Sequence, residues 1–481
     1  MENKLDLIRR EILVRLAKAF FEKSLIKTID RIPIEMRPRD SKELSRCCVY
    51  KDREMIRYRI IAAMGLGEED ETDELTPLFE FAQYALYEEK VSDKHLTILT
   101  DLCSACIKAH YRVTDVCRGC VARPCTLSCG RDAVEFINGR AHIKEELCVN
   151  CGKCMTVCPY QAIIRVPVPC EDACPTGAIS KDENGKEEID LNKCILCGKC
   201  LTACPFGAVA ERSQIIHVLK ALTGEKHTTA LIAPSIAGQF AGTFEQLITA
   251  LKKLGFDEVV EVAEGAVHTA VNETIEFKEK MEQNQPFMTT SCCPAYVMAT
   301  EKLLPKLKPY VSHTPSPMIY SARIAKERYP ETHTVFIGPC LAKRSEAFNS
   351  GIVDNTITFD ELDALFGGRD IVVSDCTPAE WKSPAAKEGR MFAVTGGVAN
   401  SVKHCAGGKI TFNPLVINGF DRKSLKQLPS KLLNRNSCNF IEVMTCEGGC
   451  VAGPGGLAKV NIATQSVEKL AAVSASIKLE E

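Results

Sequence analysis

The chain has 481 residues, which is enough for two to four domains and a sizeable hydrophobic core. Its 60 Lys and Arg nearly balance its 62 Asp and Glu, so the formal net charge of −2 gives no argument for nucleic acid or an anionic membrane as a partner. Its 26 cysteines stand mostly in CxxC runs with a trailing CxxxC. A secreted disulfide scaffold would be short, so this pattern favours metal clusters in a reducing compartment.

The N-terminus carries charges throughout and lacks the apolar core of a signal peptide. The sequence also has no apolar run of about 18 residues, so a membrane-spanning helix is not expected. We therefore expect a soluble, cytoplasmic protein.

Residues 1–98 are predicted to be a helical region. Apolar residues recur at three- and four-residue steps over residues 5–20, which is typical of one face of a helix. Further helices are expected at residues 56–64 and 75–87, with an acidic linker between them. The sequence assigns this region no chemical task.

Residues 99–212 are predicted to be a ferredoxin-like α+β iron–sulphur domain. Two cysteine runs have the complete CxxCxxCxxxCP spacing of bacterial 4Fe–4S ferredoxins, in which the fourth cysteine ligates the neighbouring cluster. A third run is a loosened form of this motif and a fourth keeps only its trailing half, so the region is an internal repeat. In that order the runs are Cys148, Cys151, Cys154 and Cys158; Cys194, Cys197, Cys200 and Cys204; Cys117, Cys120, Cys125 and Cys129; and Cys170 with Cys174.

Two allocations of these cysteines to clusters stay open. In the first, each fourth cysteine completes the cluster of another run, and three clusters result: Cys117, Cys120, Cys125 and Cys158; Cys148, Cys151, Cys154 and Cys129; and Cys194, Cys197, Cys200 and Cys174. The cysteines left over are the candidate ligands of a fourth cluster: Cys103, Cys106, Cys170 and Cys204. In the second allocation the two complete runs pair with each other. The sequence therefore predicts two to four accessory 4Fe–4S clusters, arranged to carry electrons.

Residues 213–481 are predicted to be an α/β domain. A helix is expected at residues 244–254, and strands at residues 229–233, 333–337, 371–374, 391–394 and 441–444. Three cysteine loops follow strands or precede helices, and ligands in open α/β sheets commonly bind at the carboxyl ends of strands. We expect the three loops to converge there.

The three loops, at residues 290–296, 338–344 and 444–454, supply five cysteines: Cys292, Cys293, Cys340, Cys446 and Cys450. Four thiolates can hold one 4Fe–4S cluster. The fifth thiol and the nearby Lys343 exceed what a structural or electron-carrying cluster needs.

These loops resemble the three signature loops of the FeFe-hydrogenases, over roughly residues 226–460. The resemblance implies a two-lobed catalytic domain that holds an H-cluster, a 4Fe–4S subcluster joined to a two-iron unit with carbonyl and cyanide ligands. It implies that the 4Fe–4S subcluster is bound by Cys293, Cys340, Cys446 and Cys450, and that Lys343 contacts a cyanide. It also implies further contacts with the two-iron unit, from Ala233, Pro234, Ser235, Met444 and Phe392.

The family relays protons through a residue at the position of Cys292. By the same resemblance, the relay continues through Glu273, Glu276 and Ser312, while Lys280 stands near its exit. The implied activity is reversible oxidation of H2 to protons and electrons. The implied partners are ferredoxin or a similar small electron carrier and the hydrogenase maturation proteins.

Several positions depart from the family pattern: Gly338, Tyr296, Glu447, Val398 to Asn400, and Met318. They indicate a divergent branch and changes around the cofactor. The alternative functions are an iron–sulphur protein that lacks the two-iron unit and serves cluster assembly, and an H2 sensor. The remaining thiols are expected to be ordinary ones: Cys47, Cys48, Cys376, Cys405 and Cys438.

Overall fold

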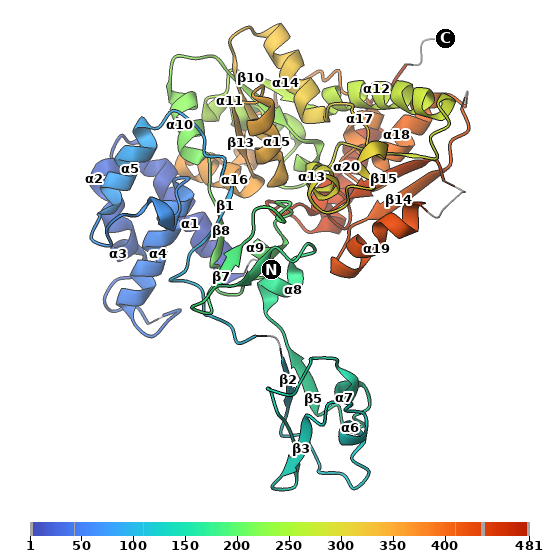
Figure 1. Ribbon diagram of the computed structural model, residues 1–481. Coiled ribbons are helices and arrows are strands. Elements are labelled where there is room, and N and C mark those ends of the chain that lie inside the picture. Colours follow the sequence, from blue (N-terminus) through green and yellow to red (C-terminus); the bar gives the residue numbers. More distant parts are fainter. Residues whose placement is uncertain (1–2, 43, 109, 409, 434–437, 479–481) are drawn as a thin grey trace.

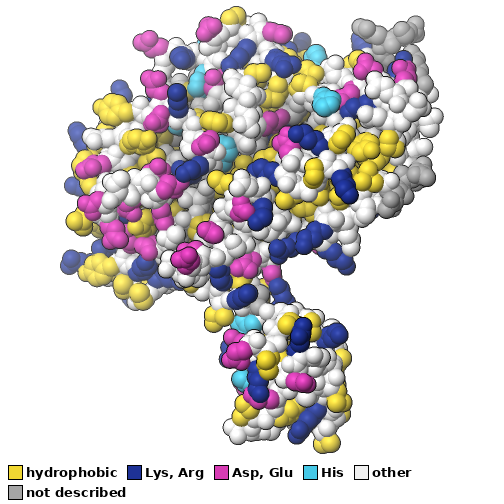
Figure 2. All heavy atoms as spheres, viewed as in Figure 1, with side chains coloured by type: hydrophobic (Ala, Val, Ile, Leu, Met, Phe, Trp, Pro, Cys, Tyr) yellow, Lys and Arg dark blue, Asp and Glu magenta, His cyan; other side chains and the backbone are white. Residues whose placement is uncertain are grey.

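The computed structural model describes residues 3–42, 44–108, 110–408, 410–433 and 438–478. Figure 1 shows a large body, built from the N-terminal helices and the C-terminal α/β region, and a small module that extends from it on two connecting segments. Figure 2 shows acidic and basic side chains interspersed over the visible face. Each helix in the described part of the chain is too short or too polar to cross a bilayer.

The N-terminal region is a set of helices packed on the α/β region: α1 (Lys4–Phe21), α2 (Leu25–Thr28), α3 (Ile32–Met36), α4 (Val49–Ala63) and α5 (Leu78–Tyr87). The apolar face of α1 is buried, as its periodicity predicts. This helix packs on α16 (Phe359–Gly368), and a Cβ added at Gly368 would lie 2.6 Å from the Ala17 Cβ. Arg9 pairs with Asp360 of α16 at 2.7 Å.

The acidic segment between α4 and α5 is folded onto the body and is not an open linker. A short 3₁₀ helix, Glu68–Asp70, lies in it. Glu69 and Asp70 both pair with the buried guanidinium of Arg212, and Glu68 accepts a hydrogen bond from Thr100 at 2.6 Å. The negative charges that suggested solvent exposure have cationic and hydroxyl partners across the fold.

Small antiparallel sheets and short helices make up the iron–sulphur region, as the ferredoxin-like prediction requires. Its elements are β1 (Leu96–Ile98), β2 (His110–Val113), α6 (Pro124–Leu127), β3 (Val134–Ile137), β4 (Arg140–Ile143), α7 (Lys153–Thr156), β5 (Ile163–Val166), α8 (Pro169–Ala173), β6 (Ile179–Lys181), β7 (Glu187–Ile189), α9 (Lys199–Ala203) and β8 (Val209–Glu211). β1 pairs with β8, β2 with β5, β3 with β4 and β6 with β7. The module that extends from the body runs from β2 to β5 (Figure 1).

Two separate parallel sheets organise the C-terminal region, which confirms the two-lobed α/β prediction. One sheet has the order β10-β9-β12-β13 and the other β11-β15-β14. The strands are β9 (Thr228–Ile232), β10 (Glu258–Glu261), β11 (Met288–Thr289), β12 (His333–Ile337), β13 (Asn355–Ile357), β14 (Pro414–Asn418) and β15 (Phe440–Met444). The helices around them, besides α16, are α10 (Ile215–Thr223), α11 (Phe244–Leu254), α12 (Val262–Glu282), α13 (Pro294–Lys302), α14 (Pro317–Arg328), α15 (Ala342–Ser350), α17 (Lys387–Met391), α18 (Gly397–Ala406), α19 (Arg422–Leu433) and α20 (Val460–Ala472).

Two of the predicted strands are wrong. Residues 371–374 run into a 3₁₀ helix, Val373–Asp375, and residues 391–394 form the end of α17 and the turn that follows it. Phe392 and Ala393 are buried there by packing between helices. A short apolar run shows that a segment is buried but does not fix its backbone conformation. Helix α11 has the predicted bounds, because its Thr243 capping box and Gly255 mark both ends locally.

Candidate active site

The three cysteine loops and the Ser235 loop leave the carboxyl ends of four parallel strands. Ser235 follows β9 and Cys340 follows β12 in one sheet, while Cys293 follows β11 and Cys446 follows β15 in the other. The carboxyl ends of parallel strands share one edge of a sheet, which is where α/β folds bind ligands. The site thus lies between two lobes, each contributing two loops.

The loop thiols are close enough to interact electrostatically. Burial raises the pKa of Cys446, and Cys340, Cys293 and Cys450 raise it further. Burial likewise raises the pKa of Cys340 to about 11, again with a contribution from Cys293. The structure therefore brings together the four cysteines that the resemblance assigns to one cluster, in surroundings that disfavour four free thiolates without a cation.

Glycines let the last loop fold tightly around its cysteines. Gly448 and Gly449 have φ of +104° and +93°, values that side-chain-bearing residues rarely adopt. A Cβ on Gly449 would lie 2.7 Å from the Thr395 backbone nitrogen. The loop is tied to the Cys340 loop by the Gly455 N–H, which donates to the Pro339 carbonyl at 3.0 Å.

Lys343 lies buried beside Cys292. Its ammonium donates to the Cys292 carbonyl at 3.3 Å, to Ser316 Oγ at 2.9 Å and to Glu346 Oε2 at 2.6 Å. It also lowers the pKa of Cys450, which burial raises to about 12 overall. This buried ammonium thus lies close to both the surplus cysteine and a predicted cluster ligand.

Ser235 is fully buried, and its hydroxyl finds no hydrogen-bond partner among the described residues. Its loop is held by Gln239, whose amide donates to the Ser235 carbonyl at 3.0 Å. A buried hydroxyl without a partner is costly, so the arrangement fits a bound group that presents an acceptor there. Met444, Phe392 and Cys292 belong to a single buried apolar cluster at the same site.

Glu273 and Glu276 lie on α12, one turn apart, with Glu273 nearer the cysteines. Glu273 is fully buried and accepts a hydrogen bond from the Ser291 backbone N–H at 3.3 Å, next to Cys292. Burial, together with the charge of Glu276, raises the pKa of Glu273 to about 8. Its second carboxyl oxygen has no partner among the residues that the structure describes.

Ser312 connects the two glutamates. Its hydroxyl donates to Glu276 Oε2 at 2.6 Å, and it lies close enough to Glu273 to lower the pKa of that residue. Burial acts to raise the pKa of Glu276, but hydrogen bonds from Lys280 and Ser312 outweigh it and lower the pKa. Glu276 also accepts from the backbone N–H of His313 at 2.9 Å, and His313 is exposed. The polar path therefore runs from beside Cys292 to the surface.

Lys280 lies next to Glu276, the outermost carboxyl of this path. Its side chain is buried, pairs with Glu276 at 2.8 Å and donates to the Val311 carbonyl at 2.9 Å. Periodicity placed it correctly on the face of α12 that carries Glu273 and Glu276. It did not reveal that a neighbouring loop covers the end of that face.

Glu442 is a residue of this site that sequence reasoning missed. It is fully buried in β15 and accepts hydrogen bonds from the Gly396 and Ala399 backbone N–H groups at 2.7 and 2.8 Å. Its charge raises the pKa of Glu273, Cys292 and Cys450. A single acid within an otherwise apolar strand, directly before a cysteine loop, is the sequence signal that marks it.

The departures from the family pattern are accommodated by local packing. A Cβ on Gly338 would lie 2.6 Å from the Phe336 ring, so this ring occupies the space that a side chain at 338 would need. Tyr296 is fully buried and donates to Thr289 Oγ1 at 3.0 Å. Met318 and Val398 are fully buried as well.

The accessory cysteines fall into separate groups. Cys117, Cys120, Cys125 and Cys158 line one hollow. Cys148 and Cys129 raise the pKa of Cys154, after burial, and Cys197, Cys194 and Cys174 raise that of Cys200 in the same way. Cys151 is exposed on its loop. These groups correspond to the first allocation, in which each fourth cysteine completes the cluster of another run.

The Cys194–Cys200 loop packs directly against the cysteine loops of the C-terminal domain. A Cβ on Gly198 would lie 2.5 Å from Pro454, four residues after Cys450. Lys302 donates to the Cys194 carbonyl at 2.7 Å, and Lys199 donates to the Phe420 carbonyl at 2.6 Å. Cys197 also contributes to the raised pKa of Cys446. This accessory group is therefore adjacent to the four converging cysteines of the C-terminal domain.

Comparisons with known proteins agree with this arrangement. Residues 226–454 match the family described as iron only hydrogenase large subunit, C-terminal domain. Residues 169–208 match a 4Fe-4S dicluster domain, and residues 140–163 match a 4Fe-4S binding domain.

Iron hydrogenase 1 of Clostridium pasteurianum is 29% identical over 308 residues, which are 52% of this chain and 53% of that protein. A probable cytosolic Fe-S cluster assembly factor of Aedes aegypti is 25% identical over 271 residues, 44% of this chain and 56% of that protein. A solved [FeFe]-hydrogenase of Chlamydomonas reinhardtii is 22% identical with a TM-score of 0.42 and covers 55% of this chain and 91% of that chain. The chain thus spans little more than half the length of these two curated relatives.

Proposed function

We propose that this hydrogenase-like protein, with iron–sulphur domains ahead of an iron-only hydrogenase domain, catalyses the reversible conversion of H2 into two protons and two electrons. One observation carries the proposal. Around four converging cysteines lie groups that a plain electron-carrying cluster does not need. They are the Cys292 thiol, the Lys343 ammonium, the Ser235 hydroxyl, which has no partner among the described residues, and the Glu273 carboxyl, whose pKa is raised.

The proposed cofactor is the family's H-cluster, whose two-iron unit supplies the position at which H2 binds and is split. Cys293, Cys340, Cys446 and Cys450 would hold its 4Fe–4S part. Lys343 and Ser235 would each donate a hydrogen bond to an anionic ligand of the two-iron unit. The bond from the Lys343 ammonium would be charge-assisted, and the bond from Ser235 would give its buried hydroxyl an acceptor.

Proton movement is assigned to residues of this chain. Cys292 would exchange a proton at the buried end, and Glu273, Ser312 and Glu276 would pass it to the surface near His313. A group that shuttles protons works best when its pKa lies near the working pH, and burial brings Glu273 to about 8. The lower pKa of Glu276 favours its charged form, which accepts the proton from Ser312.

Electrons would leave through the accessory clusters, starting with the group of Cys194, Cys197, Cys200 and Cys174 that packs on the catalytic loops. A ferredoxin or a similar small carrier is the proposed partner, and maturation proteins would insert the two-iron unit. We assign the protein to the cytoplasm.

Infrared spectroscopy of protein produced with the maturation proteins tests the proposal. Carbonyl and cyanide bands, together with H2 uptake or evolution, are the expected result. A Ser235→Ala variant should shift the cyanide bands, because one donor is lost, and Ser345→Ala on the outer side of α15 serves as the control. Bands absent from fully matured wild-type protein would reject the hydrogenase function.

The second candidate function is iron–sulphur cluster assembly, because relatives carry that name. It predicts a 4Fe–4S cluster at the same four cysteines without carbonyl or cyanide bands. An H2 sensor would show the bands but negligible turnover.

A further inference from the structure

The segment that matches the dicluster domain has too few cysteines for two clusters. Residues 169–208 match a domain that holds two 4Fe–4S clusters, and two such clusters need eight thiolates. This segment contains six cysteines: Cys170, Cys174, Cys194, Cys197, Cys200 and Cys204. One cluster takes Cys174, Cys194, Cys197 and Cys200. Cys170 and Cys204 remain, and a second cluster needs two more ligands.

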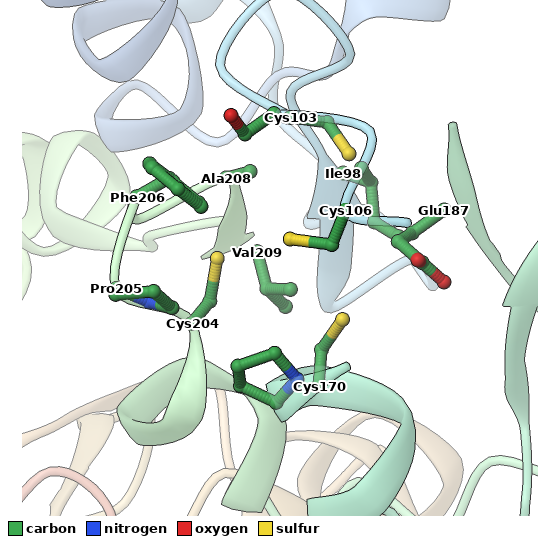
Figure 3. A pocket seen from close by; sticks show the side chains of 12 residues that line it. Ile98, Cys103, Cys106, Cys170, Glu187, Cys204, Pro205, Phe206, Ala208 and Val209 are labelled. Carbon is green, nitrogen blue, oxygen red and sulfur yellow. The ribbon is translucent and has the colours of Figure 1, made fainter. Parts of the chain in front are cut away.

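The structure brings two cysteines from outside that segment to the same place. Cys103 and Cys106 line one hollow together with Cys170 and Cys204, and Figure 3 shows the four sulphur atoms around it. The remaining walls are mostly apolar, including Ile98, Pro169, Phe206 and Val209. Cys103, Cys170 and Cys204 are buried, and Cys106 is half-buried.

We propose that Cys103, Cys106, Cys170 and Cys204 bind a further 4Fe–4S cluster in a ferredoxin-like unit that the chain assembles from two separated segments. The two segments together give Cys103-x2-Cys106 followed by Cys170-x3-Cys174-Pro. These are the first and last spacings of a complete run, Cys-x2-Cys-x2-Cys-x3-Cys-Pro, and residues 107–169 stand where the complete run has two residues between its second and third cysteines. The module from β2 to β5 is inserted at that point.

Strand pairing supports a unit built from two segments. β1 lies shortly before Cys103 and β8 lies shortly after Cys204. The two strands pair antiparallel, with Leu96 opposite Glu211 and Ile98 opposite Val209. The first and last strands of the unit therefore lie side by side although the inserted module separates them in sequence. The inserted module closes in the same manner, since β2 pairs with β5.

The loop that carries Cys103 is fixed by groups from two other regions. Lys186 donates to the Thr100 and Cys103 carbonyls at 2.8 and 2.9 Å. Arg46, from the N-terminal helical region, donates to the Leu102 carbonyl at 3.1 Å and lies over the Phe206 ring, 4.7 Å from its centroid. One role of the N-terminal region is therefore to position this ligand loop.

The proposed cluster would sit at the neck of the inserted module. Cys106 precedes β2, and Cys170 follows β5, so the same cluster would join the two connections of the module to the body. Cys170 lies in the first turn of α8 and Cys174 directly follows that helix, and Cys200 and Cys204 hold the same positions in α9, which packs on α8. The cluster is thus next to the group that contacts the catalytic loops, and single electrons can pass from the module through it, with no bond made or broken.

Iron analysis of the full chain, produced without the maturation proteins and reconstituted, tests the site independently of hydrogenase activity. Five cubanes correspond to about 20 iron atoms per chain, and four to about 16. The Cys103→Ala/Cys106→Ala double variant should lose about four iron atoms and one reduced-cluster signal in electron paramagnetic resonance. The matched control, Cys47→Ala/Cys48→Ala, should keep both.

Wild-type protein with only about 16 iron atoms, or a double variant with as much iron as the control, overturns the proposal. Should the double variant fail to fold, Cys170→Ser changes a ligand from the other segment and must show the same loss. The wild-type count decides in either case.

The position at the neck is tested by reduction and proteolysis; this part rests on the proposed function. In the double variant produced with the maturation proteins, H2 should reduce the cluster of Cys174, Cys194, Cys197 and Cys200 but leave the clusters of the inserted module oxidised, while dithionite reduces all of them. Its neck connections should also be cut faster by trypsin than those of the control. Full reduction of the module by H2 in the variant would exclude the relay, whereas no reduction by H2 in wild type would count against the hydrogenase function alone.

Discussion

The cysteine site of the C-terminal domain and the cysteine hollow of the inserted module differ in what surrounds their thiols. The hollow lined by Cys117 and its partners has walls of alanine, proline, aromatic and isoleucine side chains with one arginine, Arg118. The C-terminal site adds a buried ammonium, a buried hydroxyl that has no partner among the described residues, and two buried carboxyls, those of Glu273 and Glu442. A cluster that only carries electrons needs cysteine ligands and apolar surroundings, whereas the proposed reaction of H2 also needs groups that bind anionic ligands and transfer protons.

The largest effect is expected from replacing Cys292, the cysteine that is not among the four proposed cluster ligands. Cys292→Ala should lower H2 turnover by about 10²–10⁴-fold, because the first proton exchange is lost, while iron content and carbonyl bands persist. Cys376→Ala, in a buried thiol of the same domain away from the site, should leave turnover unchanged. Turnover of the Cys292→Ala variant at the wild-type rate would show that the surplus thiol has no catalytic task.

The next test removes the proton acceptor near the surface. Glu276→Gln should lower turnover by about 10²-fold, since an amide cannot take the proton from Ser312. Ser312→Ala should have a smaller effect, because water can bridge the two glutamates. The control is Glu279→Gln, on the exposed side of α12. Equal rates for Glu276→Gln and Glu279→Gln would place the proton path elsewhere.

Glu273 should give the C-terminal domain a stability that depends on pH. Between its ordinary pKa of 4.5 and its folded-state pKa of about 8, the folded protein binds this proton and the unfolded chain does not. Stability therefore falls as pH rises through this window, by an amount on the order of a few kcal/mol. Anaerobic thermal unfolding of Glu273→Gln should show a flatter pH profile than wild type; an unchanged slope would mean that another group titrates.

The smallest expected effect concerns packing under the loops. Gly338→Ala places a methyl group against the Phe336 ring and should destabilise the protein by about 1–3 kcal/mol. Gly130→Ala, in the inserted module, meets nothing within 4 Å and should be nearly neutral. Equal melting temperatures for the two variants would show that the ring moves aside at no cost.

Local chemistry explains which predictions were accurate. Helix α11 carries its own start and stop signals, and the complete cysteine runs place three ligands on one short loop, so neither depends on distant residues. The predicted strands at 371–374 and 391–394 failed because their apolar residues are buried against helices. Lys280 was placed on the correct helix face, but the loop that covers it comes from residue 311.

The sequence by itself determined the ligand types, the order of the cysteine loops and the resemblance that they carry, because spacing within a loop is fixed by covalent geometry. Only the tertiary structure decided which runs share a hollow and that β1 pairs with β8 across an inserted module. It also decided that Ser235 and Glu273 are buried, each with a polar atom that has no partner among the described residues. Those features depend on which distant segments pack together, and burial sets the cost of an unpaired hydroxyl or charge only once that packing is complete.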